Sequence, residues 1–253
     1  MKNHYDVLII GGGIGGLMTA HRLTQNAPSL SVCLVEKGHP LKNRLCPIVA
    51  KKVDHCIKCR SCAIMEGMGG AGAFSDGKYV ISTEYGGWLT DFLPKDTVLD
   101  YIEQADKILV SYGATTERFL PSNELKKLCL QHDLHMQQAQ LKHLGTDANF
   151  DTMVRLVEDL EHRCEIYTDT TVTAVDKDTH QVTMLNSRGS ASVTADTIIF
   201  AVGRVGSKLF TKWCADNQIP MTNNQVDIGV RVELPSFYLI HKFNVSIQQS
   251  QLF

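Results

Sequence analysis

The sequence contains no long hydrophobic run. None of its apolar segments approaches the roughly 20 residues needed to cross a bilayer. The short apolar run near the N-terminus leads directly into glycines and does not form a signal-peptide pattern. We therefore expect no membrane span and a cytoplasmic location. In such a reducing compartment the eight cysteines are not expected to form a disulfide framework.

An excess of charge of either sign is also absent. The 253 residues include 25 Lys and Arg against 27 Asp and Glu, which gives a formal net charge of -2, and no basic run is longer than two residues. This balance gives no reason to expect nucleic acid as a partner, and it leaves a small-molecule substrate or an electron carrier. The ten histidines lie in no recognisable catalytic motif, so the sequence assigns no catalytic acid or base.

What the sequence does contain is a glycine fingerprint close to its start. Residues 7–10 are apolar and rich in β-branched side chains, which is typical of a strand buried on both faces. Gly11, Gly13 and Gly16 follow in the pattern GxGxxG. The first glycine permits a tight turn, the second lets a pyrophosphate approach the backbone, and the third allows the next helix to pack closely on the strand. The N-terminus of that helix would face the phosphates.

A carboxylate stands where a dinucleotide site needs one. A second apolar run, residues 31–35, ends at Glu36, twenty residues beyond Gly16. An acid at this point suits the two hydroxyls of an adenosine ribose and would repel a 2′-phosphate. The sequence therefore predicts a dinucleotide site instead of a plain structural βαβ unit. The predicted contacts in this unit are Gly11, Gly13, Ile14, Gly15, Gly16, Glu36 and Lys37.

The fingerprint alone does not choose between FAD and NAD, because its physics is the same for both cofactors. The site begins within a dozen residues of the N-terminus, and the acid sits in the sequence Val-Glu-Lys-Gly. Both features resemble FAD-binding flavoproteins more than NAD dehydrogenases. We expect FAD, and an NAD-binding dehydrogenase is the alternative.

A polar and basic segment, residues 39–64, carries four of the cysteines. Cys56, Cys59 and Cys62 are separated by two residues each, and Cys46 precedes a proline. Bacterial ferredoxins use a C-x2-C-x2-C run with a fourth ligand beside a proline, although here that cysteine lies upstream. Zinc sites usually use paired CxxC units. An iron–sulfur cluster, zinc, thiol–disulfide exchange beside a flavin, and unligated thiols all remain open.

Residues 67–78, GMGGAGAFSDGK, carry very little side-chain volume. The first seven positions hold four glycines and two alanines, which indicates a backbone that lies against a flat or charged ligand. Successive N–H groups in such a loop can form an anion-binding nest. Ser75, Asp76 and Lys78 add a hydroxyl, a carboxylate and an ammonium group beside it. A flexible glycine loop is the alternative.

Several of these motifs together resemble a known family. The fingerprint, GGAGAFSDGK after a cysteine-rich loop, HLGTD at residues 143–147 and VDIGVRVELP at residues 226–235 are similar to uncharacterised bacterial FAD-dependent dehydrogenases. That family is related to the glutathione-reductase-type flavoproteins. The resemblance covers about residues 5–235. It also implies NAD(P)H as an electron donor.

The resemblance also implies roles for particular residues. The glycine loop would lie near the flavin pyrophosphate and ring, the backbone of Val172 would touch the adenine, and a turn at residues 203–206 would close around FAD. The residues carried over in this way are Gly69, Gly70, Gly72, Ser75, Lys78, Val172 and Gly203. After residue 235 the resemblance ends. The family's later glycine–aspartate motif has no counterpart, because no Gly-Asp dipeptide occurs in the chain, and we expect a truncated chain.

The predicted fold is α/β: a parallel Rossmann-like FAD-binding sheet with an antiparallel β-meander and a helical insertion. A helix is expected at residues 151–163. The meander is expected from short runs at 172–175, 182–185 and 191–193, and the return strand at 196–202. The predicted parts are the first part of an FAD-binding domain (1–96), a helical insertion (97–142), the return part with the meander (143–210) and the start of a truncated substrate-side segment (211–253).

These features together predict an FAD-dependent oxidoreductase, a dehydrogenase of unknown substrate. A bound flavin would carry the redox chemistry while the protein positions it and tunes its potential. The alternatives are an NAD-binding dehydrogenase and a non-catalytic nucleotide-binding or electron-transfer module with a cysteine-ligated centre.

Overall fold

The computed structural model describes residues 1–59, 61–84, 86–136, 139–223 and 228–229. The motif predicted at residues 226–235 and the sequence that follows it lie outside the described residues, apart from Ile228 and Gly229. Among the described helices, none combines the length and the apolar character that a bilayer crossing requires.

Six strands form the main sheet, in the order β5-β2-β1-β8-β7-β6. Strands β5, β2, β1 and β8 pair in parallel, and β8, β7 and β6 pair antiparallel. This arrangement confirms the predicted α/β fold with a parallel sheet and a meander. The bounds are β1 (His4–Ile10), β2 (Val32–Val35), β5 (Glu165–Tyr167), β6 (Thr171–Val175), β7 (Gln181–Asn186) and β8 (Gly189–Phe200).

Strand β8 joins the meander to the parallel sheet. The prediction of separate strands at 191–193 and 196–202 is wrong, because one strand of 12 residues spans both runs. Its first half pairs with β7, beginning at Gly189 opposite Asn186, and its second half pairs with β1 from Thr194 to Phe200. The same backbone therefore serves both parts of the sheet.

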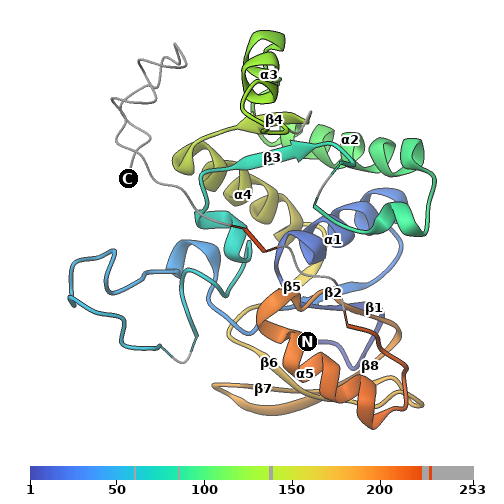
Figure 1. Cartoon of the computed structure of the whole chain (residues 1–253). Helices are drawn as coiled ribbons and strands as arrows, with labels where there is room; N and C mark the ends of the chain where they lie inside the picture. Colours follow the sequence, from blue (N-terminus) through green and yellow to red (C-terminus); the bar gives the residue numbers. More distant parts are fainter. Residues whose placement is uncertain (60, 85, 137–138, 224–227, 230–253) are drawn as a thin grey trace.

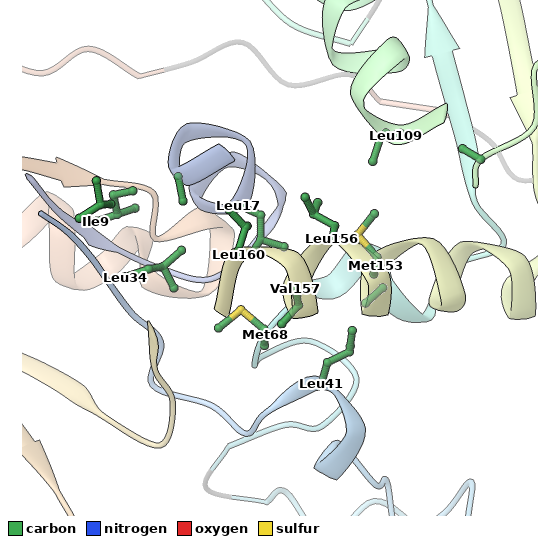
Figure 2. Packing of buried hydrophobic residues seen from close by; sticks show 14 of the residues in the cluster. Ile9, Leu17, Leu34, Leu41, Met68, Leu109, Met153, Leu156, Val157 and Leu160 are labelled. Atoms are coloured by element: carbon green, nitrogen blue, oxygen red, sulfur yellow. The ribbon is translucent and has the colours of Figure 1, made fainter. Parts of the chain in front are cut away.

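Helices cover one face of the parallel strands. Helix α1 (Ile14–Asn26) and helix α4 (Thr146–Glu161) pack there, and Figure 1 places them on the side of the sheet opposite the meander. Leu17 of α1 and Leu160 of α4 are fully buried in this layer. Helix α4 begins five residues before the predicted start, directly after Gly145 (φ 79°). Figure 2 shows the cluster, which also includes Met68 from the glycine-rich loop.

The other face of the parallel strands packs against the meander. Tyr5 and Leu8 of β1 form a second buried cluster with Val182 and Met184 of β7. Because both faces of β1 are covered, its near-continuous apolar sequence is explained. The buried strand holds the following glycine loop at a fixed place on the sheet.

The region between β2 and α4 contains a small second sheet. β3 (Lys78–Ile81) pairs antiparallel with β4 (Gln140–His143), so the chain before the expected helical insertion is paired with the end of that insertion (Figure 1). The helices here are α2 (Lys95–Ser111) and α3 (Asn123–Leu130), and short 3-10 turns are η1 (Leu41–Asn43), η2 (Ala71–Phe74) and η3 (Leu89–Asp91).

A buried ion network ties α2 to this small sheet. Lys142 of β4 is 1% exposed, and its Nζ lies 2.7 Å from Oδ1 of Asp106, which is 4% exposed. Arg118 completes the network by binding both Asp106 and Glu103. A buried charge of this kind is tolerated only with its partner in place.

The expected turn at residues 203–206 is wrong. These residues begin helix α5 (Gly203–Asp216), which follows β8 directly. Two glycines so close together are typical of a turn, but a side chain at Gly206 would clash with Val202. Glycine therefore serves close packing inside the helix, and the signal for a turn was misleading.

Candidate cofactor site

A cavity of about 770 Å³ opens at the carboxyl ends of the parallel strands. Ile10, Val35 and Phe200, the last residues of β1, β2 and β8, line it. Ligands of open α/β sheets bind at this edge. The volume also falls within the range of about 300–1,000 Å³ that is usual for small-molecule and cofactor sites.

Two glycines of the fingerprint are required by the fold itself. Gly11 has φ 112°, and a Cβ there would lie 2.4 Å from the carbonyl oxygen of Ala201. A Cβ on Gly16 would lie 1.9 Å from the carbonyl oxygen of Gly11. These close approaches account for the first and third glycines of the motif through protein packing alone.

Gly13 has no such reason to be glycine. Its backbone is ordinary for any residue (φ -74°, ψ -178°), and the nearest atom to a Cβ would be the Cα of Gly70 at 3.8 Å. Gly13 lines the cavity at the start of α1. A side chain here would therefore enter the space of the cavity without meeting the protein.

Backbone N–H groups converge on this part of the cavity. The first N–H groups of α1 have no partners within the helix, and Ile14 and Gly15 line the cavity. Ala71 and Gly72 also line the cavity, and no acceptor in the described part of the chain binds their N–H groups. Together with the positive end of the α1 dipole, this arrangement suits an anionic ligand.

Glu36 lies at the sheet edge and binds backbone, with 7% of its surface exposed. Oε2 accepts from the N–H of Gly12 at 2.7 Å, and Oε1 accepts from the N–H groups of Gly38 at 2.8 Å and Gly67 at 3.1 Å. The carboxylate also lines the cavity. It therefore links the fingerprint loop to the glycine-rich loop while it faces the ligand space.

Arg44 holds the glycine-rich loop from the opposite side. It is 2% exposed, and its guanidinium donates to four carbonyl groups at 2.7–2.9 Å. The guanidinium also lies over the ring of Phe74, 4.6 Å from the centroid. The four accepting residues are Ala63, Ile64, Met68 and Gly70.

The two glycine loops are joined directly. The N–H of Gly69 donates to the carbonyl of Gly12 at 2.8 Å, and a Cβ on Gly70 would lie 3.0 Å from the Cα of Gly13. Gly69 and Gly70 both have positive φ, 85° and 64°, which explains why glycine is needed there.

The far end of the cavity is apolar and aromatic. Val172 and Val175 of β6 line it together with Phe200, Phe210 and Trp213. The rings of Phe210 and Trp213 stack at 6.0 Å, and Trp213 Nε1 donates to the carbonyl of Val175 at 2.8 Å. Helix α5 is thus fixed to the meander by its tryptophan.

Eleven of the fourteen residues predicted to bind the cofactor line this one cavity. Gly16 lies behind the loop, Ser75 Oγ donates to the carbonyl of Gly72, and Lys78 pairs with Asp76 at 2.8 Å; these three do not line it. The lining residues are Gly11, Gly13, Ile14, Gly15, Glu36, Lys37, Gly69, Gly70, Gly72, Val172 and Gly203.

Sequence reasoning missed Gly12 and Arg44. A Cβ on Gly12 would meet the side chains of Met68 and Glu36 at 2.9–3.0 Å, so this position also needs a small residue. Its place inside the fingerprint was the available signal. Arg44 stands in a basic segment, and no pattern there separates a buried arginine from exposed lysines.

The cysteine-rich segment loops away from the cavity, at the left of Figure 1. Cys56 and Cys59 are exposed, and Cys46 and Cys62 are half-buried free thiols. In the part of the chain that the structure describes, no three His, Cys, Asp or Glu side chains are grouped as ligands for a metal ion. The geometry therefore gives no support to an iron–sulfur cluster or zinc site here.

Structural comparison finds partial similarity to known proteins at low sequence identity. The 3-ketosteroid-delta4-(5alpha)-dehydrogenase from Rhodococcus jostii RHA1 is 14% identical, with a TM-score of 0.48, over 79% of this chain and 46% of that chain. The glycine oxidase from Geobacillus kaustophilus is 14% identical, with a TM-score of 0.45, over 83% of this chain and 59% of that chain. The present chain thus spans about half the length of these proteins.

Sequence comparison gives one short match and one long match. The mitochondrial L-2-hydroxyglutarate dehydrogenase of Nematostella vectensis is 50% identical over 40 residues, which is 16% of this chain and 9% of that protein. The family described as Pyridine nucleotide-disulphide oxidoreductase matches residues 5–212. Because this match covers most of the sequence, the chain belongs to the pyridine nucleotide-disulphide oxidoreductase family.

Proposed function

We propose that the chain binds FAD in the 770 Å³ cavity and acts as an FAD-dependent oxidoreductase, a dehydrogenase for a small-molecule substrate. The observation that carries this proposal is Gly13. Its conformation and its protein surroundings would both accept a side chain, so the reason for glycine there is a ligand that lies against the backbone.

The donors around Gly13 fit the diphosphate of FAD. Residues of the first turn of α1 line the same cavity as Ala71 and Gly72, whose N–H groups have no acceptor among the described residues. Phosphate oxygens bind well to such unpartnered N–H groups. The residues that would hold the diphosphate are therefore Gly13, Ile14 and Gly15 on one side and the 71–72 backbone on the other.

Glu36 fits the ribose of the adenosine half. Oε2 accepts a single hydrogen bond in the protein, from Gly12, and a carboxylate oxygen can accept a second. A ribose hydroxyl could donate this second hydrogen bond to Oε2. The negative charge would repel the 2′-phosphate of an NADP-type ligand. Val172 and the nearby aromatic rings supply an apolar surface for the adenine.

The flavin itself would supply the hydride or electron transfer, with NAD(P)H as a candidate reductant. The chain's own contribution is to bind and orient the cofactor and to exclude water with the apolar wall at Val175, Phe200 and Trp213. We assign the FAD-binding domain to residues 1–96 and 143–210, interrupted by an insertion at 97–142, and a substrate-side segment to 211–253.

The deciding experiment identifies the nucleotide. The protein is purified, heated to release bound small molecules, and the supernatant is analysed by chromatography and absorbance. The expected result is FAD in near-stoichiometric amount, and a protein with flavin absorption bands that NADH or NADPH bleaches under anaerobic conditions. Release of NAD alone would overturn the proposal in favour of a nicotinamide-dependent enzyme.

A titration of the apo-protein provides an independent test. The chain has two tryptophans; Trp213 lines the cavity and Trp88 is 47% exposed elsewhere. In a Trp88→Phe variant the remaining fluorescence comes from Trp213. We expect FAD to quench it saturably, and NAD⁺ and NADP⁺ to have much weaker effects. Absence of quenching by FAD, with normal folding, would contradict the proposed site.

A further inference from the structure

We propose that Arg44 is the residue that positions the glycine-rich loop for the cofactor's diphosphate and supplies positive charge opposite it, without touching the phosphates. This inference rests on the proposed function. Arg44 is buried and lies outside the cavity lining. We infer that it provides part of the affinity for the cofactor, in addition to the part provided by the fingerprint glycines.

The first observation is a buried cation that binds only neutral groups. The guanidinium of Arg44 is bound by four carbonyl oxygens, and no carboxylate of the described residues forms an ion pair with it within 4.0 Å. Burial lowers the pKa of Arg44 to about 10, and the charge of Glu36 opposes that shift. A buried charge without an adjacent counterion is costly. Glu36 offsets the effect of burial only in part, which leaves room for an anion supplied from outside the chain.

The second observation is the direction in which Arg44 turns the peptide groups. In a trans peptide the C=O and N–H point to opposite sides. Arg44 Nη1 binds the carbonyls of Met68 and Gly70, each at 2.7 Å. The N–H groups of the same two peptides belong to Gly69 and Ala71.

These two N–H groups differ in their hydrogen-bond partners. The N–H of Gly69 donates to the carbonyl of Gly12 and so ties the loop to the fingerprint. The N–H of Ala71 has no acceptor within the described part of the chain, and Ala71 lines the cavity. Arg44 binds the Gly70 carbonyl, so the N–H of Ala71 in the same peptide points away from Arg44. We infer that it points toward the ligand.

The third observation is proximity to the predicted phosphate position. Gly70 lies so close to Gly13 that a Cβ added to Gly70 would come within 3.0 Å of the Cα of Gly13. The guanidinium is thus separated from the start of α1 by a single peptide unit. At that range, and shielded from water, its charge is only weakly screened.

The test compares three variants by their dissociation constants for FAD and ADP, measured by titration at two salt concentrations. Arg44→Met removes the charge and keeps most of the side-chain volume. Arg44→Lys keeps the charge and loses the fork of donors. Ala71→Pro deletes a single N–H at the first position of a 3-10 turn, where proline is tolerated. Arg188→Met, at an exposed arginine, is the control.

We expect Arg44→Met to weaken FAD and ADP binding at least tenfold at both salt concentrations, because salt screens a buried charge only weakly. Arg44→Lys should lie between Arg44→Met and the unmodified protein. Ala71→Pro should weaken both ligands several-fold while Arg44 is intact, and its unfolding temperature should stay close to normal. Adenosine, which lacks phosphates, should bind all the variants alike.

The variants would behave differently if Arg44 only held the loop in place and had no electrostatic effect on the ligand. Arg44→Met would then weaken adenosine binding as much as ADP binding, and that outcome would overturn the inference. If Arg44→Met fails to fold, Ala71→Pro still decides: unchanged ADP affinity in that variant rejects the proposed donor. If the unmodified protein itself does not bind FAD, the proposed function fails, and this is seen before any variant is made.

Discussion

The carboxylate of Glu36 and the guanidinium of Arg44 bind the same peptide loop, one through its N–H groups and the other through its carbonyl groups. Glu36 accepts from Gly67, and Arg44 donates to Met68 and Gly70. Two opposite charges therefore fix a segment that carries almost no side chains of its own. The acid that would bind ribose is also part of the protein's own framework.

Glu36→Gln should destabilise the protein even without a cofactor. An amide has one acceptor oxygen, so at least one of the N–H groups of Gly12, Gly38 and Gly67 would lose its partner. A buried unsatisfied donor costs about 1–3 kcal/mol. Chemical denaturation of the apo-protein measures this loss. Glu117→Gln, at an exposed position, should change the free energy of unfolding by less than about 0.5 kcal/mol, and an equal effect in both variants would argue against the network.

Gly13→Ala should separate binding from folding. The new methyl group meets no protein atom closer than 3.8 Å, so the free energy of unfolding should change by less than about 1 kcal/mol. The same methyl group enters the cavity, and FAD affinity should fall at least about tenfold, or 1.4 kcal/mol.

The matched control for Gly13→Ala is Gly87→Ala. A Cβ there meets nothing within 4 Å, and the residue lies outside the cavity lining. Normal FAD content is expected in this control. Normal FAD content in Gly13→Ala as well would show that no ligand lies against the fingerprint backbone.

Asp106→Asn should strongly destabilise the region around the small sheet. It would leave the ammonium group of Lys142, 1% exposed, without its counterion. Removal of one partner from a buried ion pair costs about 3–5 kcal/mol. Urea denaturation should register this change, and Asp100→Asn, at an exposed position of the same helix, should be nearly neutral. A loss below about 1 kcal/mol would mean that Lys142 finds another partner.

His21 should make the protein less stable in mild acid. The ring is 5% exposed and its Nδ1 has no hydrogen-bond partner in the described structure. Burial lowers the pKa of His21 below its ordinary value of 6.5, with help from the charges of Arg163 and Arg22 and against that of Asp159. Below about pH 6.5 the unfolded chain therefore binds a proton that the folded chain refuses, and stability falls as the pH drops.

A His21→Phe variant tests this pH dependence. Phenylalanine keeps an edge-to-face contact with Tyr112, whose ring lies 5.8 Å from that of His21, but it cannot titrate. Its stability between about pH 7 and 5.5 should fall less than that of the unmodified protein, by up to about 1.4 kcal/mol per pH unit. His162→Phe, at an exposed position, should keep the original slope. Identical slopes in all three proteins would refute the assignment.

Local patterns predicted the elements that are buried on both faces. The apolar runs before Gly11 and Glu36 form β1 and β2, because a short continuous apolar run is typical of a strand that is buried on both faces. The small sheet was missed for the opposite reason. Both β3 and β4 are only four residues long. They pair 59 or more residues apart, from Ile81 to Gln140, so only the tertiary fold brings them together.

The part of the candidate site that is formed by backbone was predictable from the sequence. Glycine spacing predicted that the fingerprint loop would line the cavity, and Gly11 and Gly16 are positions where the fold leaves no room for a side chain. The partners of Glu36 and the role of Arg44 were not predictable, because both depend on a loop that returns from 31 and 26 residues away. Helix α5 was hidden by two glycines that normally mark a turn.

The central strand β1 receives its second neighbour very late in synthesis. His4 contacts Thr194 of β8, 190 residues further along the chain. At a usual rate of about 5–20 residues per second, a ribosome needs roughly 10–40 s to make that partner. During this interval the nascent chain presents one unpaired edge of β1, whose second half is entirely apolar, and such an edge is a template for wrong pairing.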